Sequence, residues 1–273
     1  MENGTITYVQ SLREDLGIFR VTPENGVPDF KAGQFLTLGL PLESKIVNRA
    51  YSIASSPENK KFFEFVIRWV RRPLPGRLTS LLFNAKVGDK ISWAKPAGNL
   101  TINNTLPSGE KDTRRIVCIG GGTGLAPFVS FAQHLHDTND KREIVVLHGA
   151  SYVDELSYKQ LLTDLENESI DKGKDKWNFK YRAAISRPEE WTNRAWNGHK
   201  GRIEQFLRSN DAGKSPLDEL VGEKITKDNT MFYVCGWQGT IDGTMDYLKT
   251  KNFVTEKNKR EDGSYEVKFE SYG

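Results

Sequence analysis

The spacing of apolar residues along the chain changes character near residue 105. Before that point, short runs rich in Val, Ile, Phe, Thr and Tyr are separated by Gly, Pro and Asn, a pattern that predicts β-strands. These runs cover residues 4–12, 17–23, 33–41, 49–56, 62–70 and 89–96. One segment, 76–85, has its apolar residues at helical spacing. Closely spaced strands with a single helix are typical of a small antiparallel β-barrel.

From residue 115 onward, strand and helix patterns alternate. Strands are predicted at 115–120, 143–150, 177–186 and 230–237, helices at 126–137, 154–168, 202–209 and 240–253, and a solvated loop at 167–176. This alternation predicts a parallel sheet with right-handed crossovers, whose ligands bind beyond the carboxyl ends of the strands. We therefore expect two domains, a β-barrel at 1–108 and an α/β domain at 113–273, joined by a polar segment at 106–115.

Composition and charge exclude several classes of function. The 273 residues carry a net charge of +3, too little to indicate a nucleic-acid partner. No run approaches the ~18 apolar residues of a membrane span, and the N-terminus lacks a secretory signal pattern. Two cysteines cannot form a disulfide framework or hold an iron–sulfur cluster, and the four histidines lack metal-site spacing. We expect a cytoplasmic protein without a metal site.

A glycine-rich turn, CIGGGTGLAPF at 118–128, joins the first predicted strand of the second domain to its helix. Glycines remove Cβ atoms where a ligand must approach the backbone, and the N–H groups at a helix start can face a phosphate. The turn therefore predicts a nucleotide pyrophosphate site. A tight turn that needs left-handed residues is the alternative.

A second unusual segment is NRAYSIASSP at 48–57, in the predicted barrel. Strand alternation places Arg49 and Tyr51 on one face and Ser52 on the other, unless the strand bulges. A guanidinium binds phosphate, a phenol ring stacks on a flat heterocycle, and a hydroxyl can donate to a ring nitrogen. Together they suit a dinucleotide with a redox ring such as FAD, although a surface strand explains the segment equally well. Gly76 and Thr79 mark a second helix start able to face phosphate.

Arg-x-Tyr-Ser, Gly-x-x-Thr before a helix, GGGTGLAP, HGA, SR and CGWQG occur in the order found in ferredoxin–NADP(H) reductases. The chain resembles the plant- and bacterial-type members of that family over almost its full length. The resemblance implies an N-terminal antiparallel β-barrel that binds FAD and a C-terminal Rossmann-like parallel sheet that binds NADP(H).

The resemblance also assigns residues to FAD. It places Arg49 on the pyrophosphate, Tyr51 against one flavin face and Ser52 near flavin N5. A strand beside the ribityl and phosphate portion of FAD would comprise Val66, Ile67 and Arg68. Gly76 and Thr79 would form a second contact with the pyrophosphate.

In the second domain the resemblance assigns residues to the nicotinamide dinucleotide, to proton exchange and to the second face of the flavin. Gly122, Thr123 and Gly124 match the pyrophosphate loop. Ser186 and Arg187 match the pair that receives the 2′-phosphate of NADP(H), with Arg202 as a second basic residue. Cys235 and Gly236 match the Cys-Gly pair at the nicotinamide. Glu270 would assist proton exchange and Tyr272 would cover the other flavin face, with Phe269 as the alternative cap because Gly273 follows Tyr272. The residues implied in catalysis are Ser52, Cys235, Glu270 and Tyr272.

The resemblance implies hydride transfer between NADP(H) and FAD, coupled to one-electron exchange with ferredoxin or flavodoxin. A basic rim would steer these acidic partners into transient complexes; it comprises Lys60, Lys61, Arg68, Arg71, Arg72 and Arg77. We expect a monomer or weak dimer.

Three alternatives stay open. NAD(H) is one, since Ser151 stands where many bacterial relatives carry Arg, and Glu189 and Glu190 follow Arg187 closely. A reductase component serving an oxygenase or free flavin is another. The third is an FAD-binding subunit without nicotinamide nucleotide activity of its own.

Overall fold

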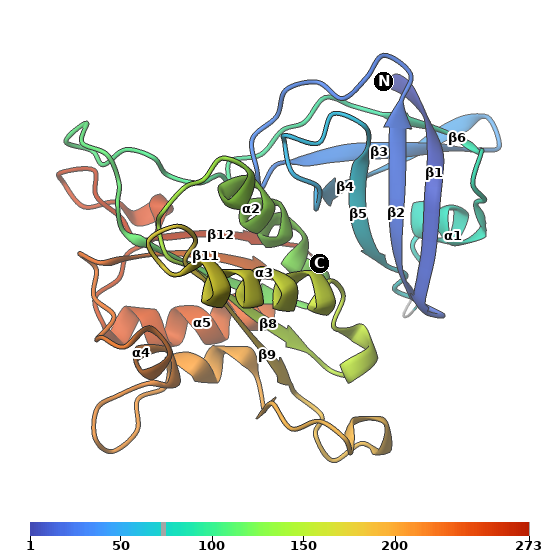
Figure 1. Cartoon of the computed structure of the whole chain (residues 1–273). Helices are drawn as coiled ribbons and strands as arrows, with labels where there is room; N and C mark the ends of the chain where they lie inside the picture. The colour runs from blue at the N-terminus through green and yellow to red at the C-terminus, as the bar shows by residue number, and fades with distance from the viewer. Residues whose placement is uncertain (72–74, 273) are drawn as a thin grey trace. The chain divides into compact units, whose positions relative to one another are not determined.

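The computed structural model describes residues 1–71 and 75–272, so that Arg72 and Gly273 lie outside the described residues. The chain divides into two compact units (Figure 1). The barrel unit comprises Met1–Thr101 and Ala126–Thr138, and the sheet unit comprises Ile102–Leu125 and the chain from Asn139 onward. The domain division predicted at 108–113 stays a prediction.

Six antiparallel strands form the barrel unit, in the order β4-β3-β6-β1-β2-β5. They are β1 (Glu2–Arg13), β2 (Leu16–Pro23), β3 (Phe35–Leu42), β4 (Lys45–Ser52), β5 (Phe63–Arg68) and β6 (Lys90–Trp93). The N–H of Ala54 donates to the carbonyl of Glu64 over 2.8 Å, so the segment after β4 meets β5 and brings the two sheet edges together. Register shifts along β1 allow the bending that such curvature needs. The predicted antiparallel barrel is confirmed.

Two helices complete the barrel unit. Helix α1 (Arg77–Asn84) buries Leu78 and Leu82 in the barrel core. Helix α2 (Ala126–Asp137) is fixed to the segment that follows β4, because Ser130 donates to the carbonyl of Ser55 over 2.8 Å and Gln133 to that of Ala54 over 3.0 Å. The end of the predicted FAD strand is therefore held in place by side chains of α2.

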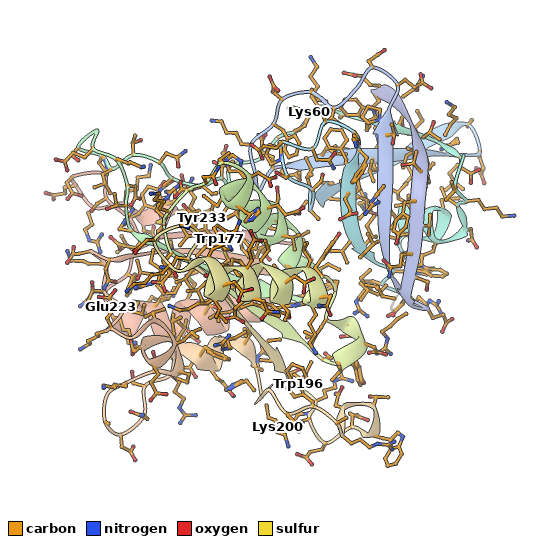
Figure 2. The ribbon with its side chains drawn as sticks, in the orientation of Figure 1. Lys60, Trp177, Trp196, Lys200, Glu223 and Tyr233 are labelled. Atoms are coloured by element: carbon orange, nitrogen blue, oxygen red, sulfur yellow. The ribbon has the colours of Figure 1, made fainter. Side chains whose placement is uncertain are left out.

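The sheet unit contains six parallel strands in the order β10-β9-β8-β7-β11-β12. They are β7 (Arg115–Gly121), β8 (Ile144–Ala150), β9 (Phe179–Ile185), β10 (His199–Lys200), β11 (Thr230–Gly236) and β12 (Val267–Ser271). The central strands β7 and β11 are buried at every position, as expected of strands covered on both faces. Tyr233 of β11 is labelled in Figure 2 and accepts a hydrogen bond from the N–H of Asn103 over 2.8 Å. The predicted parallel sheet is confirmed.

The helices of the sheet unit are α3 (Lys159–Lys172), α4 (Pro216–Val221) and α5 (Gln238–Thr250), with 3₁₀ turns η1 (Gly122–Leu125), η2 (Val153–Glu155), η3 (Trp191–Asn193), η4 (Ile203–Leu207) and η5 (Glu256–Asn258). The loop predicted at 167–176 was wrong in its first half, since α3 continues to Lys172 and Ser169 is buried against the carbonyl of Trp177 at 2.9 Å. The helix predicted at 202–209 is a 3₁₀ turn. Among the helices of the described residues, none has both the length and the apolar character that crossing a membrane requires.

Arg142 anchors the segment that leads into β7. Its guanidinium is buried and donates to the carbonyl of Asn103 at 2.7 Å, to Asn104 Oδ1 at 2.9 Å and to Asp140 at 2.8 Å. The buried guanidinium thus joins partly exposed groups from two segments of the chain, and its own donors are satisfied by them.

Replacement of Arg142 by Met should therefore destabilise the protein by about 3 kcal/mol, because Asp140 and the two asparagine groups lose their partner. The midpoint of urea unfolding measures the loss. Lys141→Met removes an exposed cation next to it and should change stability by less than ~0.5 kcal/mol. Equal midpoints for the two variants would contradict the anchoring role.

Candidate functional site

Strand β4 presents the predicted FAD residues on the barrel unit. Its pairing with β3 runs without interruption from Lys45 to Ser52. Regular alternation therefore puts Arg49 and Tyr51 on one face and Ser52 on the other, as predicted. Arg49 is exposed and donates to the carbonyl of Asn48 at 3.1 Å, and within residues 1–71 and 75–272 it has no carboxylate partner. Its charge is available to an anion.

Tyr51 has an unusual environment for a tyrosine. Its ring packs against the barrel core, and its hydroxyl is buried with no hydrogen-bond partner among the described residues. Burial raises the pKa of Tyr51, against the opposing charge of Arg49. A buried hydroxyl without a partner costs about 1–3 kcal/mol, so the site is one that a ligand with polar atoms on a flat ring would complete. These residues fit FAD.

The start of α1 offers a second anion contact. Gly76 is the N-cap residue of this helix and has no side chain that could cap the first N–H groups. The hydroxyl of Thr79 donates to the carbonyl of Gly76 at 3.0 Å, so its proton is already used. The backbone N–H groups of the first turn, rather than the Thr79 hydroxyl, are therefore the donors available to a phosphate.

The predicted FAD residues on β5 lie in three different environments. The side chain of Ile67 belongs to the barrel core and cannot contact a cofactor outside it. Val66 is also buried but lies on the opposite face of the strand. Arg68 pairs with Asp15 at 2.9 Å. Cofactor contacts from this strand would come from its backbone and from Val66.

Each glycine of the turn after β7 has a different role. A Cβ on Gly124 would lie 2.6 Å from the carbonyl carbon of Cys235 and 2.7 Å from the hydroxyl of Tyr272, so this glycine is required by packing. A Cβ on Gly121 would lie 2.7 Å from the hydroxyl of Thr240. Gly122 has φ +56° and open space around its Cβ position. The open approach to the backbone that a pyrophosphate needs is found at Gly122.

The end of the described chain reaches this turn. The hydroxyl of Tyr272 lies 3.2 Å from Thr123 Oγ1 and donates to the carbonyl of Gly121 at 3.3 Å. The N–H of Tyr272 donates to the carbonyl of Gly236 at 3.3 Å. The ring meets Trp237 edge to face, with centroids 6.3 Å apart. Tyr272 thus covers the loop predicted to bind the nucleotide.

Phe269 lies elsewhere. It packs against the core formed by β7, β8 and β11, and Lys257 Nζ lies 4.8 Å from its ring centroid. Of the two aromatic residues considered for the cap, Tyr272 is the one at the glycine-rich turn.

Cys235 and Glu270 are neighbours in register on β11 and β12. Burial, and secondly the charge of Glu270, raise the pKa of the Cys235 thiol. The thiol therefore stays protonated at neutral pH and is not a nucleophile. Burial also raises the pKa of the Glu270 carboxyl. The pair offers a neutral sulfur and a carboxyl that can exchange a proton closer to neutral pH than an exposed glutamate.

The predicted 2′-phosphate residues follow β9. Ser186 and Arg187 are exposed, and the N–H of Ser186 donates to the carbonyl of Ala150 at 2.9 Å. Arg187 donates to the hydroxyl of Tyr152 at 2.7 Å and lies over that ring, 5.4 Å from its centroid. In the described part of the chain, no carboxylate pairs with Arg187. Arg187 is therefore a positioned, uncompensated cation.

Arg202 differs in its charge environment. Its Nε bonds to the buried carboxylate of Glu204, and a terminal nitrogen donates to the carbonyl of Gly239 at 3.0 Å. Glu204 neutralises much of this charge, so Arg187 offers the stronger attraction for a phosphate. The side chain of Arg202 is still 55% exposed and can serve as a second contact.

Three residues that contact the predicted phosphate arginines were not identified from the sequence. Tyr152 and Asn193 contact Arg187, and Glu204 pairs with Arg202. Tyr152 directly follows the HGAS segment, and its aromatic ring beside an Arg could have signalled a stacking partner. Glu204 lies two residues after Arg202, within ion-pair reach. Asn193 carried no sequence signal, because an asparagine in a polar loop is ordinary.

Comparison with known proteins agrees with this geometry. Residues 3–102 match the family described as an oxidoreductase FAD-binding domain, and residues 118–246 match the oxidoreductase NAD-binding domain. A ferredoxin–NADP reductase of Azotobacter vinelandii is 30% identical over 89% of this chain and 88% of its own length. The chain belongs to the ferredoxin–NADP reductase family. The predictions of this family, and of FAD and a nicotinamide dinucleotide as its cofactors, are confirmed.

Other similarities show how widely this reductase fold is used. The reductase component of a propane 2-monooxygenase of Mycolicibacterium goodii is 30% identical over 89% of this chain but only 62% of its own length. The structure of a ferredoxin NADP+ reductase from Neisseria gonorrhoeae has a TM-score of 0.77 at 23% identity and covers 98% of this chain and 97% of that one. The two-domain fold is thus shared by reductases whose named partners differ.

The glycines of the reductase provide a direct test of the turn. Gly124→Ala should destabilise the protein by about 2–3 kcal/mol, because its Cβ collides with backbone of β11. Gly122→Ala should cost about 1 kcal/mol, because only the positive φ opposes it. Urea unfolding midpoints compare the two. A greater loss in Gly122→Ala would show that the close approach at Gly124 is misassigned.

Glu270 predicts a pH dependence. A carboxyl whose pKa is raised by folding binds more protons in the folded state, so stability falls as pH rises above the ordinary value of 4.5. Glu270→Gln removes this loss. The gain in melting temperature over the wild type should therefore be larger at about pH 7 than at about pH 4. The exposed Glu261→Gln is the control, and a gain that shrinks with rising pH would contradict the assignment.

Proposed function

We propose that this chain is an FAD-dependent ferredoxin/flavodoxin–NADP(H) reductase, which transfers hydride between NADP(H) and bound FAD and exchanges single electrons with a small acidic redox protein, a ferredoxin or a flavodoxin. The observation that supports the nucleotide choice most strongly is Arg187, an exposed cation without a carboxylate partner in the described residues and held against Tyr152. A guanidinium of this kind binds the 2′-phosphate that distinguishes NADPH from NADH. Glu189 and Glu190 are exposed and form no ion pair with it.

FAD, when bound, would supply the redox chemistry, which is two-electron exchange with a nicotinamide and one-electron exchange with a partner. The chain supplies orientation and proton control. Arg49 and the first turn of α1 would hold the FAD phosphates, Tyr51 would stack on the ring, and Ser52 would donate to a ring nitrogen. Cys235 is buried and would shape the nicotinamide slot as an uncharged side chain, and Glu270 would exchange a proton at its carboxyl.

Tyr272 would act as a gate on the nucleotide loop. Its hydroxyl contacts Thr123 and Gly121, so a nucleotide that binds along this loop competes with these two contacts. Weak contacts at 3.2 and 3.3 Å can be exchanged for those of the ligand at small cost. Movement of Tyr272 is therefore a step of binding, distinct from the chemistry.

The acidic partner is supported by the name of the A. vinelandii relative and by part of the basic rim. Within the chain, Lys60 pairs with Asp29, Arg68 with Asp15 and Arg71 with Glu14. In the described residues, Lys61 and Arg77 have no such carboxylate and remain available for steering. We also expect a cytoplasmic location, since Cys118 and Cys235 are free thiols.

A reductase component of an oxygenase is the second candidate, because the M. goodii relative bears that name at the same identity. This chain spans only 62% of the length of that relative. The ferredoxin or flavodoxin reductase and the oxygenase reductase component are distinguished by two measurements. One is the preference of the protein for NADPH or NADH, and the other is the acceptor that it reduces.

Stopped-flow reduction of the purified FAD-loaded protein tests the proposal. NADPH should reduce the flavin at much lower concentration than NADH. Arg187→Gln should weaken the apparent affinity for NADPH about 10- to 100-fold, the loss of one charged phosphate contact, and leave NADH within about twofold. Arg208→Gln removes another exposed arginine and should behave as the wild type.

Mixing the reduced protein with ferredoxin or flavodoxin tests the partner. Electron transfer should slow as ionic strength rises, because exposed charges are screened. A folded protein that binds no FAD would contradict the proposed activity, and a flavin that NADH and NADPH reduce equally well would contradict the proposed nucleotide preference. An electron-transfer rate that does not change with ionic strength would contradict electrostatic steering but not the proposed activity.

A further inference from the structure

Asn193 is the most deeply buried polar residue beside the proposed phosphate site, with a relative exposure of 1%. It lies at the end of η3, in the loop between β9 and β10. Its amide nitrogen donates to the carbonyl of Ser151 at 3.0 Å and to that of Arg187 at 2.7 Å. Its amide oxygen accepts from the N–H of Val153 at 2.9 Å.

These three bonds join two loops that are far apart in sequence. Ser151 and Val153 follow β8, and Arg187 follows β9. The first loop carries Tyr152 between the two residues that Asn193 holds. The second carries the guanidinium that donates to the Tyr152 hydroxyl at 2.7 Å. Asn193 therefore fixes the backbone on both sides of the Tyr152–Arg187 contact.

The amide is suited to this position because of its donors and acceptor. Two carbonyls and one N–H converge on it, and an amide supplies two donors and one acceptor without charge. An aspartate could still accept from the N–H of Val153, but it has no N–H to donate to the carbonyls of Ser151 and Arg187. A carboxylate oxygen would face those two carbonyl oxygens instead. It would also place a negative charge near Arg187, which no carboxylate neutralises in the described residues.

A fixed guanidinium binds better than a mobile one, because less side-chain freedom is lost when the ligand arrives. The aromatic face of Tyr152 and its hydroxyl restrict Arg187 from one side. The bond from Asn193 to the Arg187 carbonyl restricts its backbone, to which the N–H of Glu190 also donates at 3.2 Å.

We infer that Asn193 is a positioning residue for nucleotide specificity. By joining the loops after β8 and β9, it holds Arg187 on Tyr152 in the orientation that receives an adenosine 2′-phosphate. Asn193 is too buried to touch the ligand and acts through Arg187. This inference rests on the proposed NADPH preference and adds to it the element that enforces the choice.

The test compares Asn193→Asp with Asn229→Asp. Asn229 is a matched control, because its amide nitrogen donates to the carbonyl of Lys224 at 3.0 Å and its oxygen accepts from the N–H of Thr226 at 2.9 Å. It precedes β11, at the amino end of that strand, away from the proposed nucleotide loops. Both changes remove an amide that connects loop backbone.

Two readouts are taken on the FAD-loaded protein. Calorimetry gives the dissociation constants of 2′,5′-ADP, which carries the 2′-phosphate, and of 5′-AMP, which does not. Kinetics with ferricyanide give kcat and KM for NADPH and NADH. Asn193→Asp should weaken the binding of 2′,5′-ADP and raise the KM for NADPH by about 3- to 10-fold, because it both frees the Arg187 side chain and places a negative charge near it. 5′-AMP, NADH and kcat should change less than about twofold, and Asn229→Asp should match the wild type in all of them.

Tyr152→Phe supplies a second test that leaves the bonds of Asn193 in place. It removes only the hydroxyl that accepts from Arg187 and adds no charge, so the same selective weakening of 2′,5′-ADP binding would come from the loss of positioning alone. If Asn193→Asp fails to fold, this variant decides.

Equal weakening of 2′,5′-ADP and 5′-AMP, or no change in either, would overturn the inference and leave Asn193 as a loop support only. A wild-type preference for NADPH that persists unchanged in Asn193→Asp overturns the inference alone. A wild type without any preference for NADPH overturns the proposed nucleotide and this inference together.

Discussion

The close approach of Gly124 to the carboxyl end of β11 is the constraint on which the nucleotide half of the site depends. Because Gly124 has no side chain, its backbone lies against the carbonyl of Cys235 and below the hydroxyl of Tyr272. The loop after β7, the end of β11 and the end of β12 therefore meet at one edge of the parallel sheet. Thr123, Cys235, Glu270 and Tyr272 come together as a consequence, although more than a hundred residues separate the first from the others.

The presence or absence of a carboxylate partner distinguishes the cations of this chain in a way that composition cannot. Arg68, Arg71, Arg202 and Lys60 each have a carboxylate partner in the chain, whereas Arg49 and Arg187 have none among the described residues. Each of these two cations lies where the family resemblance expects a phosphate, and each is accompanied by a tyrosine. A phosphate bound at either residue would neutralise a charge that no carboxylate of the described residues neutralises.

Much of the fold could be predicted from the sequence, because strong periodicity and turn residues marked most strands. Strand β12 was not predicted, since only Val267 and Phe269 are apolar in it and its pairing with β11 is a long-range effect. The residue types of the candidate site were visible in motifs, but their partners were not. The pairing of Arg202 with Glu204, the core position of Ile67 and the three bonds of Asn193 depend on tertiary contacts that no local pattern encodes.

A crystal structure of the FAD-loaded protein with NADP+ bound is the most direct test of the proposed nucleotide site. The pyrophosphate should lie at Gly122–Gly124, the 2′-phosphate should lie on the guanidinium of Arg187, and Tyr272 should be displaced from Thr123. A dinucleotide bound at another edge of the sheet, or a 2′-phosphate in solvent with Arg187 still on Tyr152, would contradict it.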